Sequence, residues 1–183
     1  MDKNELYFIA LIPHDELKNN IRVIKERIHS VYGAGHALKS PAHITLQMPF
    51  KRGRGEEGAI STVLQRFALR EESFRVDLDG YGAFPPRVIY IRITDPDPVR
   101  SLHLRLKEVL LKELDFSEAE IMHEMQPHIT LATRDLTRAA FTEAWSEYRD
   151  NKFTGYFEVR SICLLKHNGR NWDTMMEFPF GRI

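Results

Sequence analysis

The sequence predicts an α+β fold in which a single domain, residues 1–183, is built from two related lobes. Three observations support this prediction. Helical and strand-like patterns of apolar residues alternate twice in a similar order along the chain. The tetrapeptide His-Ile-Thr-Leu occurs at 43–46 and again at 128–131. The sequence contains no linker or low-complexity segment of the kind that separates independent domains.

In the first half of the chain, apolar periodicity and turn residues define five elements. The apolar run LYFIALI is rich in β-formers and predicts a buried strand. Apolar residues then recur every three or four positions from Leu17 to Val31, which predicts an amphipathic helix that ends at the Gly33–Gly35 turn. We expect a strand at 6–12 and a short strand within 41–50, helices at 15–33 and 60–67, and a charged turn at 51–58.

The second half repeats this alternation of strands and helices. The stretch FRVDLD alternates apolar and polar residues and predicts a half-exposed strand. Asp97 followed by Pro98 is a typical helix start, and Asn168-Gly169 predicts a hairpin turn. We expect strands at 73–79, 87–93, 127–133, 156–166 and 172–180. Helices are expected at 97–114 and 138–148, and a turn at 80–86.

Composition and charge exclude several classes of function. Lys+Arg and Asp+Glu both total 26, so the formal net charge is zero, whereas proteins that bind long nucleic acid are usually basic. We therefore expect no long duplex as a partner. The apolar run at 6–12 is too short to span a bilayer, and its acidic flank is unlike a secretory signal. Cys163 has no second cysteine to pair with, which fits a reducing compartment. The sequence thus predicts a cytoplasmic protein without a membrane partner.

The repeated tetrapeptide is the most informative feature of the sequence. The residue frequencies of the chain give only about 0.003 copies by chance, so two copies indicate equivalent elements of an internal duplication. In a strand, alternate side chains share a face. Ile44 and Leu46 are therefore expected in the core, while His43 and Thr45 point to the opposite side. The same alternation in the copy at 128–131 would place two His and two Thr around a common cleft.

This quartet suits phosphoryl chemistry. One imidazole, of His43 or His128, can take a proton from the attacking group while the other donates a proton to the leaving oxygen. The hydroxyls of Thr45 and Thr130 can donate hydrogen bonds to the non-bridging oxygens. The scheme requires no metal ion.

The two motifs resemble the paired His-x-Thr-x motifs of the 2H phosphoesterase superfamily, which includes bacterial 2′-5′ RNA ligases and cyclic nucleotide phosphodiesterases. The resemblance extends to the FIALIP strand, the helix after it, FPPRVIYI and a C-terminal hairpin. It implies a bilobal, duplicated fold in which antiparallel sheets surround a central cleft and helices lie outside. It also implies metal-independent hydrolysis or transfer at 2′,3′-cyclic or 2′-5′ phosphodiesters, with His43 and His128 catalytic and Thr45 and Thr130 binding phosphate.

The chain departs from the family pattern at one position. Several ligase-like members carry a basic residue five positions after the second histidine, where this sequence has Thr133. Arg134 follows, and strict alternation would place it on the same face as His128, which makes it a candidate substrate contact. Phe84 is a second candidate, because an aromatic ring can stack on a base. Phe8 and Tyr81 could do the same, although burial in the core is the favoured interpretation for each aromatic residue.

Other charged and metal-binding patterns are weaker. His123-Glu124 begins like the zinc motif HExxH, but His128 follows five positions later and Pro127 interrupts the segment, so we expect no metal and no cofactor. Basic residues flank the first motif and either attract a phosphorylated substrate or form a solvated loop; they are Lys39, Lys51, Arg52 and Arg54. The remaining histidines are expected at the surface or in turns, at positions 14, 29, 36, 103 and 167.

The leading hypothesis is an enzyme that cleaves a 2′,3′-cyclic or 2′-5′ phosphodiester of a nucleotide or RNA end. Ligation would use the same groups in reverse. Two alternatives stay open: a non-catalytic module that binds a nucleotide or RNA end, and a hydrolase for a small cyclic phosphate unrelated to RNA. The zero net charge favours a small ligand or a strand end over a long duplex.

Overall fold

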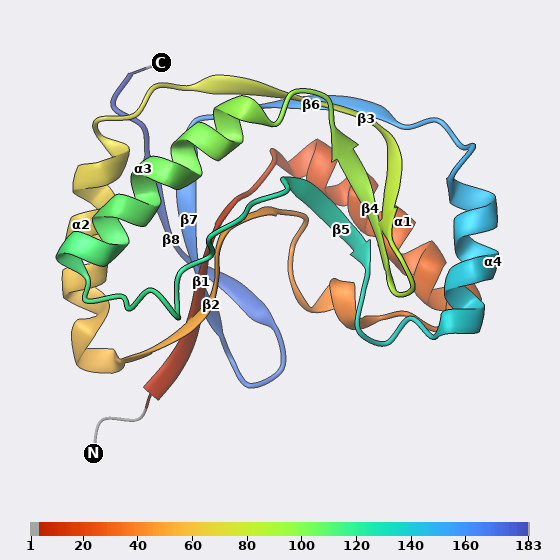
Figure 1. The fold of residues 1–183 in the computed structure, drawn as a ribbon, viewed down its shortest axis with the longest axis horizontal. Helices are drawn as coiled ribbons and strands as arrows, with labels where there is room; N and C mark the ends of the chain where they lie inside the picture. The colour runs from red at the N-terminus through yellow and green to blue at the C-terminus, as the bar shows by residue number, and fades with distance from the viewer. Residues whose placement is uncertain (1–3, 183) are drawn as a thin grey trace.

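The computed structural model describes residues 4–182, which form four α-helices and eight β-strands (Figure 1). The helices are α1 (Asp15–Tyr32), α2 (Glu57–Ala68), α3 (Asp97–Glu113) and α4 (Arg138–Tyr148). The strands are β1 (Asn4–Leu11), β2 (Ile44–Gly53), β3 (Phe74–Phe84), β4 (Val88–Ile93), β5 (His128–Ala132), β6 (Thr154–Val159), β7 (Ser161–His167) and β8 (Trp172–Pro179). Short 3₁₀ helices lie at η1 (His36–Lys39) and η2 (Arg54–Glu56). Among residues 4–182, no helix combines the length and apolar character needed to cross a membrane.

The strands form two antiparallel sheets with the same plan. One four-stranded sheet has the order β2-β1-β7-β8 and the other the order β5-β4-β3-β6. In each sheet the strand that carries the repeated motif lies at the edge, beside the strand that precedes it in the chain. A helix connects these two strands in both lobes: α1 joins β1 to β2, and α3 joins β4 to β5. These equivalent units confirm the predicted α+β class with two related lobes.

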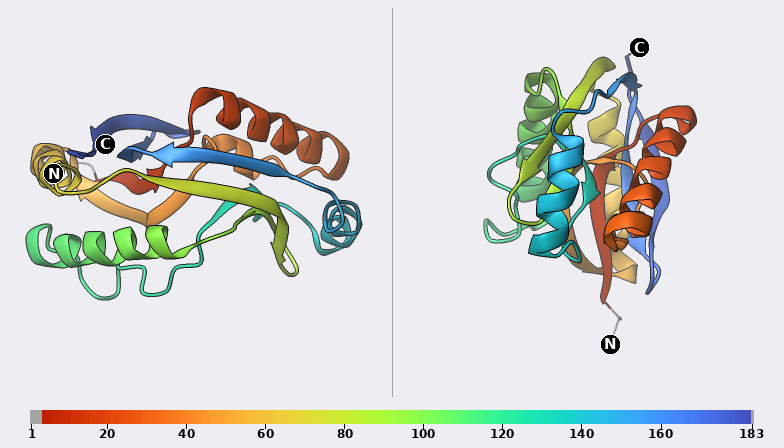
Figure 2. Two further views of the ribbon diagram at one scale, coloured as in Figure 1. Left: turned by 90° about the horizontal axis from the view of Figure 1, so that it is seen from above. Right: turned by 90° about the vertical axis from the view of Figure 1, so that its right-hand side faces the viewer.

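The connecting helices pack across the molecule rather than on their own sheet. Helix α1 contacts β5, β6 and α4, whereas α3 contacts β2 and α2. All four helices lie on the outside, where the views in Figure 2 show them flanking the strands. Buried apolar residues of both sheets, such as Leu46 and Leu131, belong to one continuous core. In each lobe, the helix that leads to the motif-bearing strand therefore packs against strands of the other lobe.

The prediction of a turn over residues 80–86 is wrong for most of its length. Strand β3 continues to Phe84, and the turn to β4 covers only residues 85–87. Gly80 has a φ of +68°, and the register with β4 shifts between Leu78 and Tyr81. The glycine therefore marks a bulge inside a longer strand, which the sequence pattern does not distinguish from a turn. Strand β2 likewise runs on to Gly53, because it pairs with β1 along that length, so the expected charged turn starts later.

The prediction of one strand over 156–166 is also wrong. Strand β6 ends at Val159 and pairs with β3, whereas β7 begins at Ser161 and pairs with β1 in the other sheet. The chain thus crosses between the lobes at Arg160. Both halves have a strand pattern, so periodicity alone does not reveal the crossing.

Candidate active site

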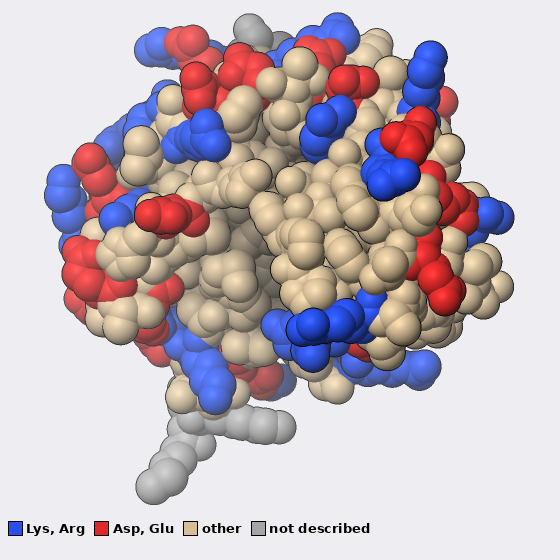
Figure 3. Space-filling model, turned by 45° about the vertical axis from the view of Figure 1, so that its right-hand side comes forward, with Lys and Arg blue, Asp and Glu red and all other residues tan. Residues whose placement is uncertain are grey.

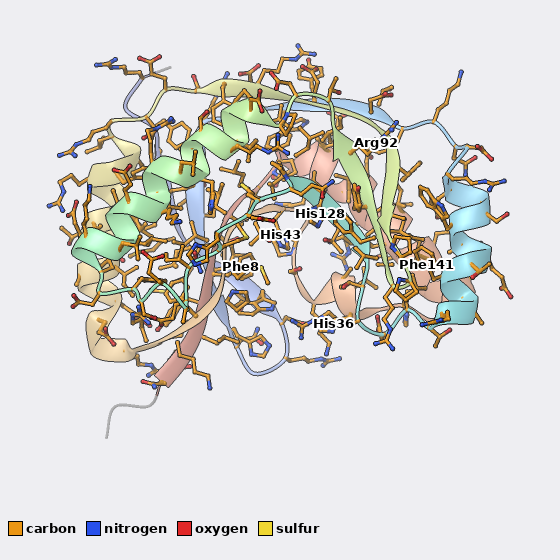
Figure 4. All side chains as sticks on the ribbon, in the orientation of Figure 1. Phe8, His36, His43, Arg92, His128 and Phe141 are labelled. Atoms are coloured by element: carbon orange, nitrogen blue, oxygen red, sulfur yellow. The ribbon has the colours of Figure 1, made fainter. Side chains whose placement is uncertain are left out.

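The two repeated motifs meet at the centre of the molecule. Edge strands β2 and β5 approach one another, with His43 immediately before β2 and His128 at the start of β5. Side chains alternate as predicted: Ile44 and Leu46 are fully buried, whereas His43 and Thr45 are partly exposed. The copy at 128–131 shows the same pattern. In Figure 4, His43 and His128 lie beside each other between the two lobes.

A single cavity of about 390 Å³ is lined by the His and Thr side chains of both motifs and by the two candidate substrate contacts. The residues that line it include His43, Thr45, Phe84, His128, Thr130 and Arg134. Figure 3 shows a hollow lined mainly by uncharged residues, with Lys and Arg side chains gathered along its lower edge. The fold therefore brings together two motifs that lie far apart in the sequence, at 43–46 and 128–131.

Both imidazoles are held by the backbone in the same way. His43 Nδ1 lies 2.7 Å from the Pro41 carbonyl oxygen, and His128 Nδ1 lies 2.6 Å from the Gln126 carbonyl oxygen. A carbonyl only accepts hydrogen bonds, so Nδ1 carries the hydrogen in each ring. Nε2 is left as the reactive nitrogen, which accepts a proton when the ring is neutral and donates one when it is charged. This arrangement is what an acid–base pair requires.

The threonine hydroxyls are available to a ligand. The backbones of Thr45 and Thr130 are fixed by pairing with Ala10 and Tyr90 in the neighbouring strands. Within residues 4–182, neither Oγ1 atom has a hydrogen-bond partner in the protein. Each hydroxyl can therefore donate a hydrogen bond to an oxygen atom bound in the cavity.

Aromatic rings enclose both histidines. The Phe8 ring centre lies 4.9 Å from that of His43, and those of Tyr90 and Phe84 lie 4.9 and 5.2 Å from that of His128. Phe8 is only 3% exposed, which confirms the expectation that it is buried, whereas Phe84 is partly exposed in the cavity. These rings limit the access of water to the imidazoles.

This burial lowers the pKa of both histidines. The pKa of His43 falls from 6.5 to about 4, first because of burial and then because of the positive charge of Lys25. The pKa of His128 is also lowered by burial, against the opposing effect of its hydrogen bond to the Gln126 carbonyl. Both rings are therefore mostly neutral at pH 7 in the ligand-free protein, and Lys25 distinguishes His43 from His128.

Lys25 is a site residue that the sequence analysis missed. It projects from the inner face of α1, is 3% exposed, and lines the cavity. Its ammonium donates hydrogen bonds to the carbonyl oxygens of Ala37 and Ser40, at 3.0 and 3.3 Å. Burial lowers the pKa of Lys25 to about 8, so the group stays mostly protonated at neutral pH. The available signal was its position on the apolar face of the helix, four residues after Ile21 and three before Ile28.

The cavity rim joins the two motif-bearing segments. The Asp135 carboxylate accepts hydrogen bonds from the backbone N–H groups of Gly35 and His36, at 2.9 and 2.8 Å. His36, expected at the surface, is half-buried and lines the cavity. The alternation used to place Arg134 does not apply, because β5 ends at Ala132 and Arg134 has a φ of +50°. Arg134 reaches the cavity from the rim instead.

Two further expectations need correction. His103 is not at the surface: it is 3% exposed on α3, and its Nδ1 lies 2.8 Å from the carbonyl oxygen of Leu46, at the end of the first motif. Of the basic residues near that motif, Lys39 lines the cavity. Arg52 instead pairs with Glu120 at 2.8 Å, so the group does not act as a single basic loop.

The described residues contain no group of three or more His, Cys, Asp or Glu side chains arranged to hold a metal ion. His123, at the start of the zinc-like pattern, has its Nε2 atom 2.7 Å from the Glu118 carbonyl oxygen. The segment around it has no helical structure, so the spacing of a helical zinc motif is not formed.

Comparisons with known proteins agree with this fold. Over 97% of its length the chain matches a structure of TT0787 of Thermus thermophilus, covering 98% of that chain with a TM-score of 0.68 and 21% identity. It also matches E. coli LigT complexed with 3′-AMP, covering 97% and 99% of the two chains with a TM-score of 0.64 and 17% identity. Comparison with curated protein sequences found no match. The model of the 2′-5′ RNA ligase superfamily matches residues 13–171, so the chain belongs to that family and the resemblance to 2H phosphoesterases is confirmed.

Proposed function

We propose that this protein is a metal-independent phosphodiesterase that acts on 2′,3′-cyclic or 2′-5′ phosphodiester bonds of nucleotides or RNA ends. The observation that carries this proposal is the pair of identically anchored imidazoles, His43 and His128, in one cavity with the hydroxyls of Thr45 and Thr130. Membership of the 2′-5′ RNA ligase superfamily supports phosphodiester chemistry. The neighbour LigT has been crystallised with 3′-AMP, ATP and phosphate, which supports a nucleotide substrate.

We assign the general base to His43 and the general acid to His128. Burial and the Lys25 charge keep His43 neutral, with Nε2 ready to accept a proton. His128 is not exposed to that charge to the same extent, since Lys25 does not contribute to its pKa shift. A bound anionic phosphate would favour the protonated form of His128, because opposite charges stabilise one another at short distance.

In hydrolysis of a cyclic phosphate, the oxygen of a water molecule attacks phosphorus. His43 Nε2 takes a proton from that water, the bond from phosphorus to one ribose oxygen breaks, and His128 Nε2 donates its proton to the departing oxygen. Thr45 and Thr130 donate hydrogen bonds to the non-bridging oxygens as negative charge builds up. The reaction leaves His43 protonated and His128 neutral, and proton exchange with water restores both rings.

Two further residues are assigned to substrate binding. Arg134 lies at the rim, where its guanidinium can contact a phosphate or a ribose hydroxyl. Phe84 packs edge-on against His128 and keeps part of its ring exposed in the cavity. An exposed aromatic face beside the reacting phosphate can stack on the adjoining base.

The proposal predicts turnover of 2′,3′-cyclic or 2′-5′-linked compounds by protein freed of metal and assayed with EDTA. The two-histidine scheme uses no Lewis acid, so chelation is expected to leave kcat unchanged. The measurement is a panel of 2′,3′-cyclic, 3′,5′-cyclic and 2′-5′-linked nucleotides, followed by product analysis. Loss of all turnover in EDTA, with recovery on adding a divalent ion, would contradict the scheme. Tight nucleotide binding without turnover would indicate a binding module instead.

The pKa directions also predict the pH dependence. A base must be neutral, so kcat/KM falls as the pH drops through the His43 pKa of about 4. An acid must be protonated, so kcat/KM also falls as the pH rises through the lowered pKa of His128. Replacing Lys25 by Met removes one of the causes that lower the His43 pKa, and the acidic limb should therefore move to higher pH. The measurement is kcat/KM against pH for both proteins.

Lys112→Met on the exposed face of α3 is the matched control and should leave the acidic limb in place. Lys25→Arg keeps the positive charge and is expected to keep the acidic limb nearer its original position. An acidic limb that does not move in Lys25→Met would show that the charge of Lys25 has no influence on His43.

A further inference from the structure

A second cavity adjoins the catalytic one beneath helix α1. Its volume is about 320 Å³. Lys25, Lys39, Ser40 and Trp172 line both cavities. Pro41 and Ala42, directly before His43, line the second cavity, so it begins beside the assigned general base.

The lining of this second cavity is cationic. Lys18, Arg22, Lys25 and Lys39 contribute to it, and within residues 4–182 no carboxylate does. We refer to these four residues and the cavity they line as the α1 groove. The whole chain carries equal numbers of acidic and basic residues, 26 of each. Four cations that line one cavity, in a chain of zero net charge, favour an anionic ligand there.

Lys25 lies at the junction of the two cavities with part of its hydrogen-bonding capacity unused. An ammonium has three N–H groups, and the carbonyl oxygens of Ala37 and Ser40 accept two of them. In the part of the chain that the structure describes, no carboxylate forms an ion pair with Lys25. A buried charge without a counter-charge is unfavourable. An anion bound at the junction would supply that counter-charge.

The outer cations of the groove can also change partners. Lys18 pairs with Asp15 at 2.6 Å, and Arg22 pairs with Glu26 at 2.9 Å. In each pair the two residues lie about one helical turn apart on α1. Ion pairs in contact with solvent contribute little to stability. Lys18 and Arg22 can therefore turn to a phosphate in the groove at small cost.

We propose that the α1 groove is a subsite for the internucleotide phosphate next to the reacting one, so that the substrate is an oligonucleotide end. The proposal rests on the proposed function, because the reacting phosphate must lie between His43 and His128. A mononucleotide or a small cyclic phosphate without a second phosphate would leave the groove empty. The groove thus selects RNA ends among the substrates considered above.

Three probes test this subsite. They are a nucleoside 2′,3′-cyclic phosphate, a dinucleotide that ends in the same group, and that dinucleotide with an uncharged methylphosphonate linkage. The natural dinucleotide is expected to have a kcat/KM about tenfold or more above the other two, the scale of one charge-assisted hydrogen-bonding site. Its KM should also depend more steeply on salt, by about 0.7 in the logarithmic slope for each added phosphate contact.

Variants of the groove test which residues produce the difference in kcat/KM between the two dinucleotides. In Lys18→Gln/Arg22→Gln, the ratio of kcat/KM for the natural and methylphosphonate dinucleotides should fall to within about twofold of one. Lys112→Gln removes an exposed helical lysine on α3 and should keep the ratio near tenfold. All three substitutions lie at solvent-accessible positions, and thermal unfolding checks that the variants remain folded.

Three outcomes would overturn the proposed subsite. Equal kcat/KM for the two dinucleotides would overturn the subsite while leaving the proposed function intact, because any gain would come from the second nucleoside. An unchanged ratio in the double variant would also overturn it. Absence of turnover with all three probes would overturn the subsite, and absence of turnover with the 2′-5′-linked nucleotides as well would overturn the proposed function.

Discussion

Replacing His43 or His128 by Ala is expected to lower kcat for a cyclic phosphodiester about 10²-fold or more, without unfolding the protein. Each imidazole is anchored through Nδ1, which leaves Nε2 as the reactive nitrogen, and a positioned acid or base typically contributes ~10²–10⁴-fold. The double variant should lose much less than the product of the two single losses, because the acid and the base act in one step. Steady-state kinetics of the four proteins of this cycle provide the measurement.

His14→Ala is the matched control for this cycle. His14 is exposed at the start of α1, and its side chain makes no capping hydrogen bond. Its replacement should leave kcat within about twofold. A folded double variant that turns over substrate at the parent rate would refute the assignment of His43 and His128.

Replacing Leu131 by Ala is expected to destabilise the protein by about 2–5 kcal/mol. Leu131 is fully buried, and truncation removes apolar contacts and leaves a cavity in the core shared by the two lobes. Urea unfolding should show the loss as a lower midpoint with little change in slope. Leu104→Ala is the same substitution at a residue that is 57% exposed on α3, and it should change the midpoint very little.

Thr130, the residue before Leu131, is expected to affect activity rather than stability. Thr130→Val keeps the size of the side chain, so the urea midpoint should stay close to that of the parent. The hydroxyl lost is one that donates to the phosphate in our proposal, and kcat should fall about tenfold, since one neutral hydrogen bond contributes about 1 kcal/mol. If Leu131→Ala reduced only activity and Thr130→Val only stability, the division of labour within the motif would be wrong.

The sequence was sufficient to place the His and Thr side chains of the two motifs in the cavity, because two rules apply to them. The repeated tetrapeptide identified equivalent strands, and alternation along a strand separated Ile44 and Leu46 from His43 and Thr45. Alternation along a strand does not place Arg134, since β5 ends at Ala132. Neither rule applies to Lys25: its spacing places it on the apolar face of α1, but no local pattern shows that this helix packs against strands of the other lobe.

The errors in the fold have a common physical origin. Strand β3 continues past Gly80, and the segment 156–166 divides at Arg160 between two sheets. Both features depend on which strands lie alongside, and partners distant in the sequence leave no trace in a local apolar pattern. His103 was misplaced for a similar reason, since its acceptor is a carbonyl oxygen 57 residues away in the chain.

The exchange of helices between the lobes limits how the cleft between the two motifs can move. A hinge that opened the cleft would pull α1 away from β5 and α3 away from β2 at the same time. Both separations would expose apolar surface, which costs about 25 cal/mol for each Å². The exchanged helices therefore oppose any change in the spacing of the two histidines. Adaptation to substrates of different size is therefore expected from rim segments and side chains rather than from closure of one lobe upon the other.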